Sequence, residues 1–245
     1  MKIKLPAFVS SLTLILLAIS IPVLIISATA TVYSHSAELY KSGFKKYQIS
    51  DRTGISNTQL SQVAQKMVDY FSGKSDTPQL TVTRNGSQFQ LYSQKELVHL
   101  EDVRSIIRLF STLQIAALLA FVLLAAVVYL DRGAGSLLRS IQSGAAAAFI
   151  FIGVLVIWAL LDFNSLFLLF HYISFSNDLW ILDPTRDYLI MMFPEGFFND
   201  SAILIVLTIL AEAVIIWCLA LIIRRALGTE RPKGPESQAQ FNRRN

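Results

Sequence analysis

Apolar residues gather along this chain in four long blocks separated by polar segments. The blocks cover residues 8–30, 109–130, 141–161 and 203–223. Each is close to the about 20 residues that a helix needs to cross a hydrocarbon core about 30 Å thick. None alternates like a barrel strand, and a helix satisfies its own backbone hydrogen bonds in lipid. The pattern predicts an α-helical integral membrane protein with four transmembrane helices.

Composition agrees with this prediction. Hydrophobic residues make up 53% of the chain and charged residues only 16%, whereas about a quarter of the residues in a soluble domain are charged. The formal net charge is +4. The segment 31–108 is also rich in lysine, but long segments translocate largely regardless of charge. The net charge therefore reflects orientation in a membrane and gives no case for nucleic-acid binding.

Lysine and arginine in the short flanks indicate which side faces the cytoplasm. Basic residues precede the first block, lie between the second and third, and follow the fourth. The segment before the fourth block is acidic instead, and Arg186 is its only basic residue. We therefore expect both termini inside the cell. The basic residues that indicate this are Lys2, Lys4, Arg132, Arg139, Arg224, Arg225, Arg231, Lys233, Arg243 and Arg244.

The first block also resembles a cleavable signal peptide. Two lysines precede it, and the small-residue pattern Ala-Thr-Ala stands at 28–30. Its apolar stretch is longer than the about 7–15 residues of a signal peptide. We favour a retained anchor and keep the cleaved form as an alternative.

The polar segments complete the predicted layout. One of them, before the fourth block, is dense in aromatic residues, which favour the headgroup layer of a membrane. The predicted segments are transmembrane helix one with a cytoplasmic N-terminus (1–30), an extracytoplasmic cap (31–105), helix two (106–130), a cytoplasmic loop (131–140), helix three (141–161), an aromatic extracytoplasmic loop (162–202), helix four (203–223) and a cytoplasmic tail (224–245).

Within the cap, local signals predict a small mixed α/β structure. Residues 55–71 carry apolar side chains at helical spacing. Residues 80–91 read as a hairpin around an Asn-Gly pair at 85–86, the preferred pair for a type I′ turn. A lone hairpin is marginal, so it should pack on the cap helix. Ser93 and Glu96 form a capping-box pattern, and the helix they start should run into helix two.

Two histidines have matching positions along helices two and three. His99 lies nine residues before Arg108, and His171 lies nine residues after Asp162. If both helices continue straight, each imidazole stands about 13 Å above the apolar core. Two imidazoles at one level could act as an acid–base pair near neutral pH. The alternative is that each is an ordinary interfacial residue.

Several carboxylates could serve these histidines. Glu96 and Asp102 lie three residues to either side of His99, so either could reach it along one helix face. For Glu96 the capping role is sufficient. Glu212 lies in the middle of helix four, where an ionisable group is costly and is a functional candidate by default. It could equally be protonated and hydrogen-bonded within the bundle.

Other chemistries lack a signal. The sequence has no GxSxG nucleophile elbow, phosphate-binding loop or dinucleotide fingerprint, and no HExxH-type spacing indicates a metal. Its single cysteine, Cys218, lies six residues before Arg224. This thiol is therefore expected near the cytoplasmic side, where it could not act as a nucleophile outside.

Three segments of the two outer regions resemble the lipoprotein intramolecular transacylase (Lit) family of Gram-positive bacteria. They are KELVHLEDVR at 95–104, FHYISFSNDLWILDP at 170–184 and FPEGFF at 193–198. The tetrapeptide TGIS at 53–56 also fits. The segments occur in order, and the layout of four helices with a cap is similar over nearly the whole chain.

The resemblance implies a reaction. In this family the sn-2 acyl chain of a diacylglyceryl lipoprotein moves to the α-amine of its N-terminal cysteine, which gives a lyso-form lipoprotein. The partners implied are that lipoprotein and membrane lipids, with neither cofactor nor metal ion, at the outer face of a bacterial cell membrane. The two family histidines correspond to His99 and His171, and Asp102 would orient His99. The predicted pocket residues are Asp102, Tyr172, Asn177, Asp178, Trp180, Asp183 and Glu195.

Two other classes of function remain open at this point. A non-catalytic membrane protein could use the cap to bind an envelope partner. A membrane hydrolase would need a nucleophile exposed to water, and Ser174 and Ser176 are available without a recognised motif.

Overall fold

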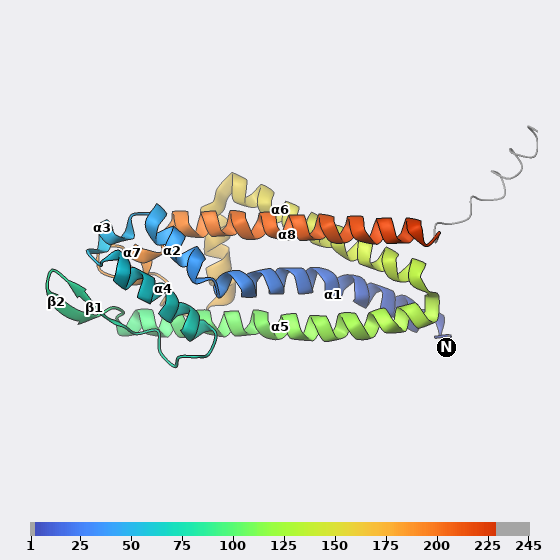
Figure 1. The fold of residues 1–245 in the computed structure, drawn as a ribbon, viewed down its shortest axis with the longest axis horizontal. Coiled ribbons are helices and arrows are strands. Elements are labelled where there is room, and N and C mark those ends of the chain that lie inside the picture. Colours follow the sequence, from blue (N-terminus) through green and yellow to red (C-terminus); the bar gives the residue numbers. More distant parts are fainter. Residues whose placement is uncertain (1–2, 229–245) are drawn as a thin grey trace, which may run out of the picture.

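Four long helices run side by side in the computed structural model, which describes residues 3–228 (Figure 1). They are α1 (Ala7–Ser34), α5 (Gln94–Arg132), α6 (Ala134–Ser174) and α8 (Glu195–Ala226). Within the described residues, these are the four helices long and apolar enough to cross a membrane. Many of their large apolar side chains are exposed, which suits contact with lipid. The prediction of a multi-pass helical membrane protein is confirmed.

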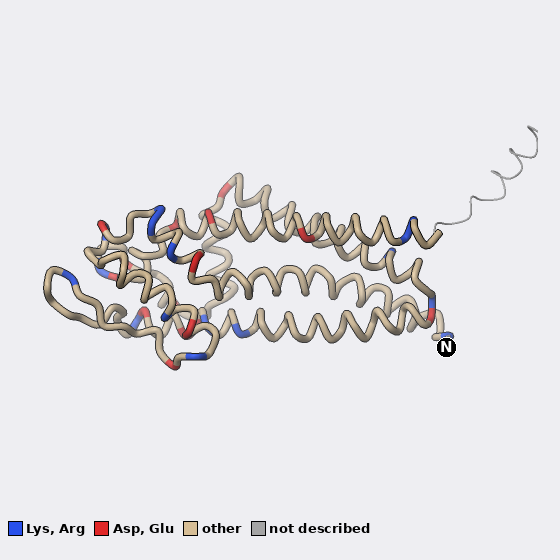
Figure 2. Tube along the Cα trace, viewed as in Figure 1, with Lys and Arg blue, Asp and Glu red and all other residues tan. Residues whose placement is uncertain are grey.

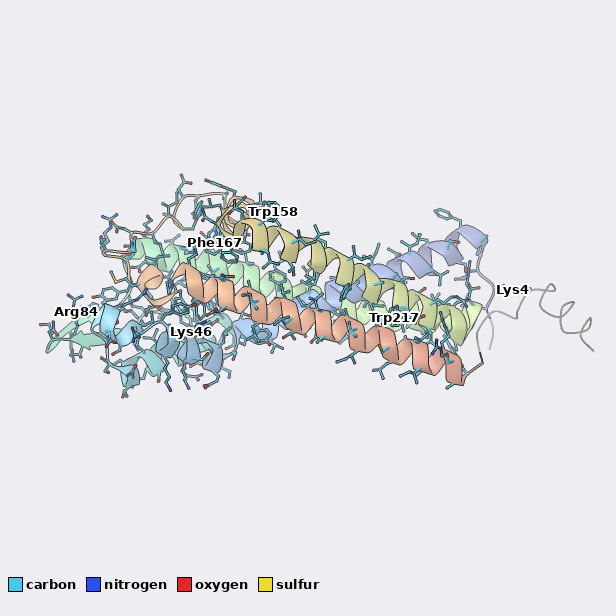
Figure 3. The ribbon with its side chains drawn as sticks, turned by 90° about the horizontal axis from the view of Figure 1, so that it is seen from above. Lys4, Lys46, Arg84, Trp158, Phe167 and Trp217 are labelled. Carbon is cyan, nitrogen blue, oxygen red and sulfur yellow. The ribbon has the colours of Figure 1, made fainter. Side chains whose placement is uncertain are left out.

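Charged residues are concentrated at the two ends of the helix bundle. Figure 2 shows acidic and basic residues gathered in the cap and at the opposite end of the bundle, with long uncharged stretches of helix between them. Lys4 lies at the end of the bundle away from the cap, whereas Arg84 and Lys46 belong to the cap (Figure 3). Residues 1–2 and 229–245, with Lys2 and most of the predicted cytoplasmic tail, lie outside the described residues.

A cap of short elements stands at one end of the bundle (Figure 1). The predicted helix at 55–71 is confirmed as α4, which begins after Ser56, whose hydroxyl accepts a hydrogen bond from the amide of Gln59. The apolar face of α4 is buried in the core of the cap. The cap elements are α2 (Ala37–Lys46), α3 (Ile49–Thr53), α4 (Asn57–Phe71), β1 (Thr81–Arg84), β2 (Ser87–Gln90) and α7 (Tyr188–Met192).

The predicted hairpin is also confirmed. Strands β1 and β2 pair antiparallel, and Asn85 and Gly86 adopt φ angles of 51° and 80° at the turn. Val82 is fully buried in the core that α4 also lines. The Phe89 ring lies 5.1 Å from that of Tyr188 on α7. The hairpin is therefore held by the rest of the cap, as a two-stranded sheet requires.

Helix α5 joins the cap to the membrane without a break. The Ser93–Glu96 capping box is present in full at its start. At about 1.5 Å per residue, its 39 residues extend nearly twice the thickness of a hydrocarbon core of about 30 Å. The first turns of α5 therefore belong to the cap.

Helix α6 differs from the predicted straight helix. Its backbone leaves the helical region at Asp162, where φ is −159° and ψ is 86°, and the remainder turns across the bundle (Figure 1). The Asp162 carboxylate accepts a hydrogen bond from the amide of Ser165, 3.0 Å away. Asp162 thus caps a new helical segment, which explains why the helix restarts in another direction.

The predicted cytoplasmic segment at 131–140 is almost entirely helical. Helix α5 continues to Arg132 and α6 begins at Ala134, so Gly133 alone connects them. Gly133 has a φ of 79°, which glycine adopts at little cost. One residue with this freedom is enough to reverse the chain.

Helix α1 is integrated into the bundle, which favours a retained anchor over a cleaved signal peptide. Its Thr29 hydroxyl donates to Glu212 of α8 over 2.9 Å. One turn further, the hydroxyls of Tyr33 and Thr208 lie 2.8 Å apart in a second hydrogen bond. Glu212 is thus hydrogen-bonded within the bundle, which was the alternative to a functional role.

Substituting Gly144 by alanine should destabilise the bundle. A Cβ at Gly144 of α6 would overlap the carbonyl oxygen of Ala18 and lie 2.8 Å from Cδ1 of Ile21. Such overpacking costs about 1–3 kcal/mol, so thermal unfolding in detergent should begin at lower temperature. Gly153→Ala is the matched control, because a Cβ there meets no atom within 4 Å. Equal midpoints for the two variants would contradict this close packing.

Candidate functional site

His99 lies in the second turn of α5, where the helix is fixed to the cap. Its side chain is buried, with 7% exposed. The Glu96 carboxylate, one turn earlier, accepts the amide of Ser93 and the amide of Leu189, each over 2.7 Å. The first contact completes the capping box, and the second ties α5 to α7. Sequence reasoning found the first contact but had no signal for the second.

His171 lies on the segment of α6 that follows the kink. It is also buried, with 8% exposed. Its Nδ1 lies 2.7 Å from the carbonyl oxygen of Phe167. Because a carbonyl oxygen only accepts hydrogen bonds, Nδ1 carries the proton and donates. The neutral ring therefore presents the lone pair of Nε2.

The two imidazoles face each other although α6 is kinked. Their ring centroids are 6.5 Å apart and their planes differ by 26°. Phe175 contacts both, with centroids 5.0 Å from His99 and 5.6 Å from His171. Trp180 and Phe167 lie 4.7 Å and 4.4 Å from His171. The pair is thus held in an aromatic enclosure at the end of the bundle beside the cap, where Figure 3 labels Phe167.

Asp102 has a different partner from the one expected. Its Oδ2 accepts a hydrogen bond from Nδ2 of Asn177 over 2.9 Å. Nδ1 of His99 is buried without a hydrogen-bond partner among residues 3–228. Asp102 therefore does not fix His99 through a hydrogen bond. The side chains of Asp102 and Asn177 instead link α5 to the loop after α6.

The other predicted pocket residues divide into two groups. Trp180 belongs to the enclosure, and the exposed Tyr172 contacts it with ring centroids 5.4 Å apart. Asp178 and Glu195 are exposed. Asp183 organises a turn, because hydrogen bonds from the hydroxyl and amide of Thr185 hold the pKa of its carboxyl below the usual value. The structure records no contact between these three carboxylates and either histidine.

A cavity of about 250 Å³ adjoins the histidine pair. Phe175 separates the two, because it lines the cavity and also contacts both imidazoles. The cavity is polar where it meets the cap and apolar toward the membrane. Its lining residues are Asp102, Ser105, Ile106, Leu109, Ser174, Phe175, Ser176 and Asn177. Sequence reasoning named Ser174 and Ser176 only as hydrolase candidates and had no signal for the cavity.

Metal chemistry has no candidate centre in the part of the chain that the structure describes. No group of three or more histidine, cysteine, aspartate or glutamate side chains is placed there to hold an ion.

Comparisons with known proteins indicate the family and the fold of this chain. The family model described as lipoprotein intramolecular transacylase Lit matches residues 13–198. The in meso structure of membrane integral Lit from Bacillus cereus is similar with a TM-score of 0.77 and 21% identity, over 92% of this chain and 100% of that one.

Two variants of the Bacillus cereus protein match in the same way. With a histidine replaced by arginine, the TM-score is 0.73 at 20% identity, over 91% of this chain and 96% of that one. With a histidine replaced by alanine, the values are 0.74 and 21%, over 91% and 97%. No curated protein matches. At these identities the solved structures establish the fold, while the family model covers both outer segments that contain the histidines.

Proposed function

Because this chain belongs to the lipoprotein intramolecular transacylase family, we propose that it moves the sn-2 acyl chain of a diacylglyceryl lipoprotein to the α-amine of the N-terminal cysteine. The product is an N-acylated lipoprotein that keeps one acyl chain on its glycerol. The observation that carries the proposal is the buried pair of His99 and His171, which two separate helices bring to a centroid distance of 6.5 Å.

The reaction requires proton transfer and no nucleophile from the enzyme. The amine nitrogen attacks the ester carbonyl, a C–N bond forms, and the C–O bond to glycerol breaks. One proton leaves the nitrogen and one arrives at the departing glycerol oxygen. A base and an acid that lie close to each other supply both proton transfers. His171 exchanges its proton through Nε2, since Nδ1 is held by Phe167.

Positioning is the second contribution. The ester and the amine belong to one flexible molecule, and holding them in contact converts their reaction into a favourable intramolecular step. The aromatic enclosure formed by Phe167, Phe175 and Trp180 would confine the glycerol beside the imidazoles. Its place at the base of the cap suits a lipid ester near the headgroup layer.

The proposed orientation places this site at the outer face. Lys4 and Arg139 mark the end of the bundle away from the cap, and basic residues flank membrane helices on the cytoplasmic side. The cap and the histidine pair would then face outward, where mature lipoproteins are displayed.

Mass spectrometry of a lipoprotein's N-terminal peptide tests the proposal. Cells with this protein should contain the peptide with an N-linked acyl chain and a monoacylglyceryl group, and cells without it should retain the diacylglyceryl form. An unchanged peptide would favour a non-catalytic role for the cap. Loss of an acyl chain without its appearance on nitrogen would favour a hydrolase.

Trp180→Ala should lower kcat by about tenfold. The Trp180 ring packs on His171 with centroids 4.7 Å apart, and such aromatic contacts contribute about 0.5–1.5 kcal/mol. Trp180→Phe should keep most of the activity, because a ring remains. Trp158→Ala is the control, since Trp158 lies outside the enclosure with 38% of its surface exposed. Equal rates for the three variants in detergent would exclude a role for this wall.

A further inference from the structure

The cavity beside the histidine pair contains a carboxylate without a cation. Asp102 is the only acidic residue that lines it, and one of its oxygens is held by Asn177. No ion pair of Asp102 is present among residues 3–228. A partly buried carboxylate in a cavity with a partly apolar lining is costly unless it meets a cation or further hydrogen bonds.

Nearby basic side chains are engaged elsewhere. Lys95 donates to the carbonyl oxygen of Ile181. Arg104 donates to the carbonyl oxygen of Ser75 over 3.2 Å and lies over the Tyr70 ring, 4.3 Å from its centroid. Neither neutralises Asp102. The chain thus keeps this carboxylate available to a cation that comes from outside.

We propose that the cavity beside Asp102 is the docking site for the protonated α-amine of the lipidated cysteine, a role that rests on the proposed function. A free α-amine has a pKa of about 7.7–8.0 and is mostly an ammonium at neutral pH. It brings three donors. Asp102 accepts one, and the hydroxyl oxygen of Ser105, whose own proton goes to the carbonyl of Glu101 over 3.0 Å, accepts another.

The remaining walls fit the rest of the same molecule. Ile106 and Leu109 line the cavity on the membrane side, where the acyl chains of the substrate begin. Asp102 follows His99 by three residues on one face of α5, so their Cβ atoms are about 5–6 Å apart. An amine bound to Asp102 therefore lies on the same face of α5 as His99, with the Phe175 ring between the cavity and the imidazole pair. Asn177 acts as a positioning residue, because it fixes one carboxylate oxygen and leaves the other for the ligand.

Equilibrium binding in detergent micelles tests this site without turnover. The full-length His171→Ala variant is titrated with a synthetic diacylglyceryl-cysteine peptide, once with a free amine and once N-acetylated. The free-amine peptide should bind about tenfold more tightly, which corresponds to about 1.4 kcal/mol. Adding Asp102→Asn should remove this preference. Adding Asp102→Glu should retain most of it, because the charge remains.

The control is Glu101→Gln in the same background, because Glu101 is exposed on the neighbouring position of α5 and its loss should leave the preference intact. Equal binding of the two peptides, or a preference that survives Asp102→Asn, would overturn the site. A phospholipid headgroup is the other possible source of a lipid ammonium, so the titration is repeated with phosphatidylethanolamine added to the detergent micelles. If this lipid fully displaces the free-amine peptide, the assignment to cysteine is overturned. The lyso-lipoprotein assay tests turnover separately, so failure of the docking site is distinguishable from failure of the proposed function.

Discussion

Alanine in place of His99 or of His171 is expected to abolish formation of the lyso form, both in cells and with the purified protein. In the proposed mechanism each imidazole carries one proton transfer, and removing such a group lowers the rate by about 10²–10⁴-fold. The measurement is the ratio of N-acylated to diacylglyceryl peptide, determined by mass spectrometry.

His35→Ala is a closely matched control for this result. Nδ1 of His35 lies 2.7 Å from the carbonyl oxygen of Thr31, four residues earlier, as Nδ1 of His171 does from Phe167. His35 has the same local geometry without a second imidazole, so its loss should leave activity unchanged. Full activity after loss of His99 or His171 would refute two-histidine catalysis.

Replacing Glu96 by alanine is expected to give the largest loss of stability in the cap. Glu96 is buried, with 1% exposed, and its two oxygens accept the amides of Ser93 and Leu189. A buried donor left without an acceptor costs about 1–3 kcal/mol. Thermal unfolding in detergent should shift downward, and amide exchange should accelerate in α7 and at the start of α5.

Two further variants separate the causes. Glu96→Gln keeps one acceptor oxygen, so its loss of stability should be intermediate. Glu101→Ala removes an exposed carboxylate from the same helix and should have little effect. If Glu96→Ala leaves α7 as protected as in the native protein, then Glu96 does not tie α5 to the cap.

Local signals explain how much of this fold the sequence could predict. The apolar blocks indicated the membrane helices, the pair Asn85-Gly86 indicated the hairpin, and the capping box indicated the start of α5. Each depends on residues close together in the chain, where one physical rule decides the outcome. The predicted depth of His171 assumed a straight helix, and the kink at Asp162 removes that assumption.

Contacts between distant segments could not be predicted in the same way. Asp102 meets Asn177 and Glu96 meets Leu189 because the loop after α6 folds onto α5, and no local pattern specifies that fold. In the sequence, Asp162 served only as the position from which His171 was counted. Asp162 caps a new helical segment because the backbone changes direction there. The pattern of hydrophobic residues continues through this point and gives no sign of the change.

The single residue between α5 and α6 has a mechanical consequence. Gly133 lies 34 residues beyond His99 along α5, a lever arm of about 50 Å. A tilt of about 5° at that hinge would displace the far end by about 4 Å, enough to separate two groups that must share one substrate. The alignment of the imidazoles must therefore be fixed close to them. Hydrogen bonds between α5 and the loop after α6, from Asn177 to Asp102 and from Lys95 to Ile181, do this. Bending of the bundle by the surrounding lipid would then leave the reacting groups in register.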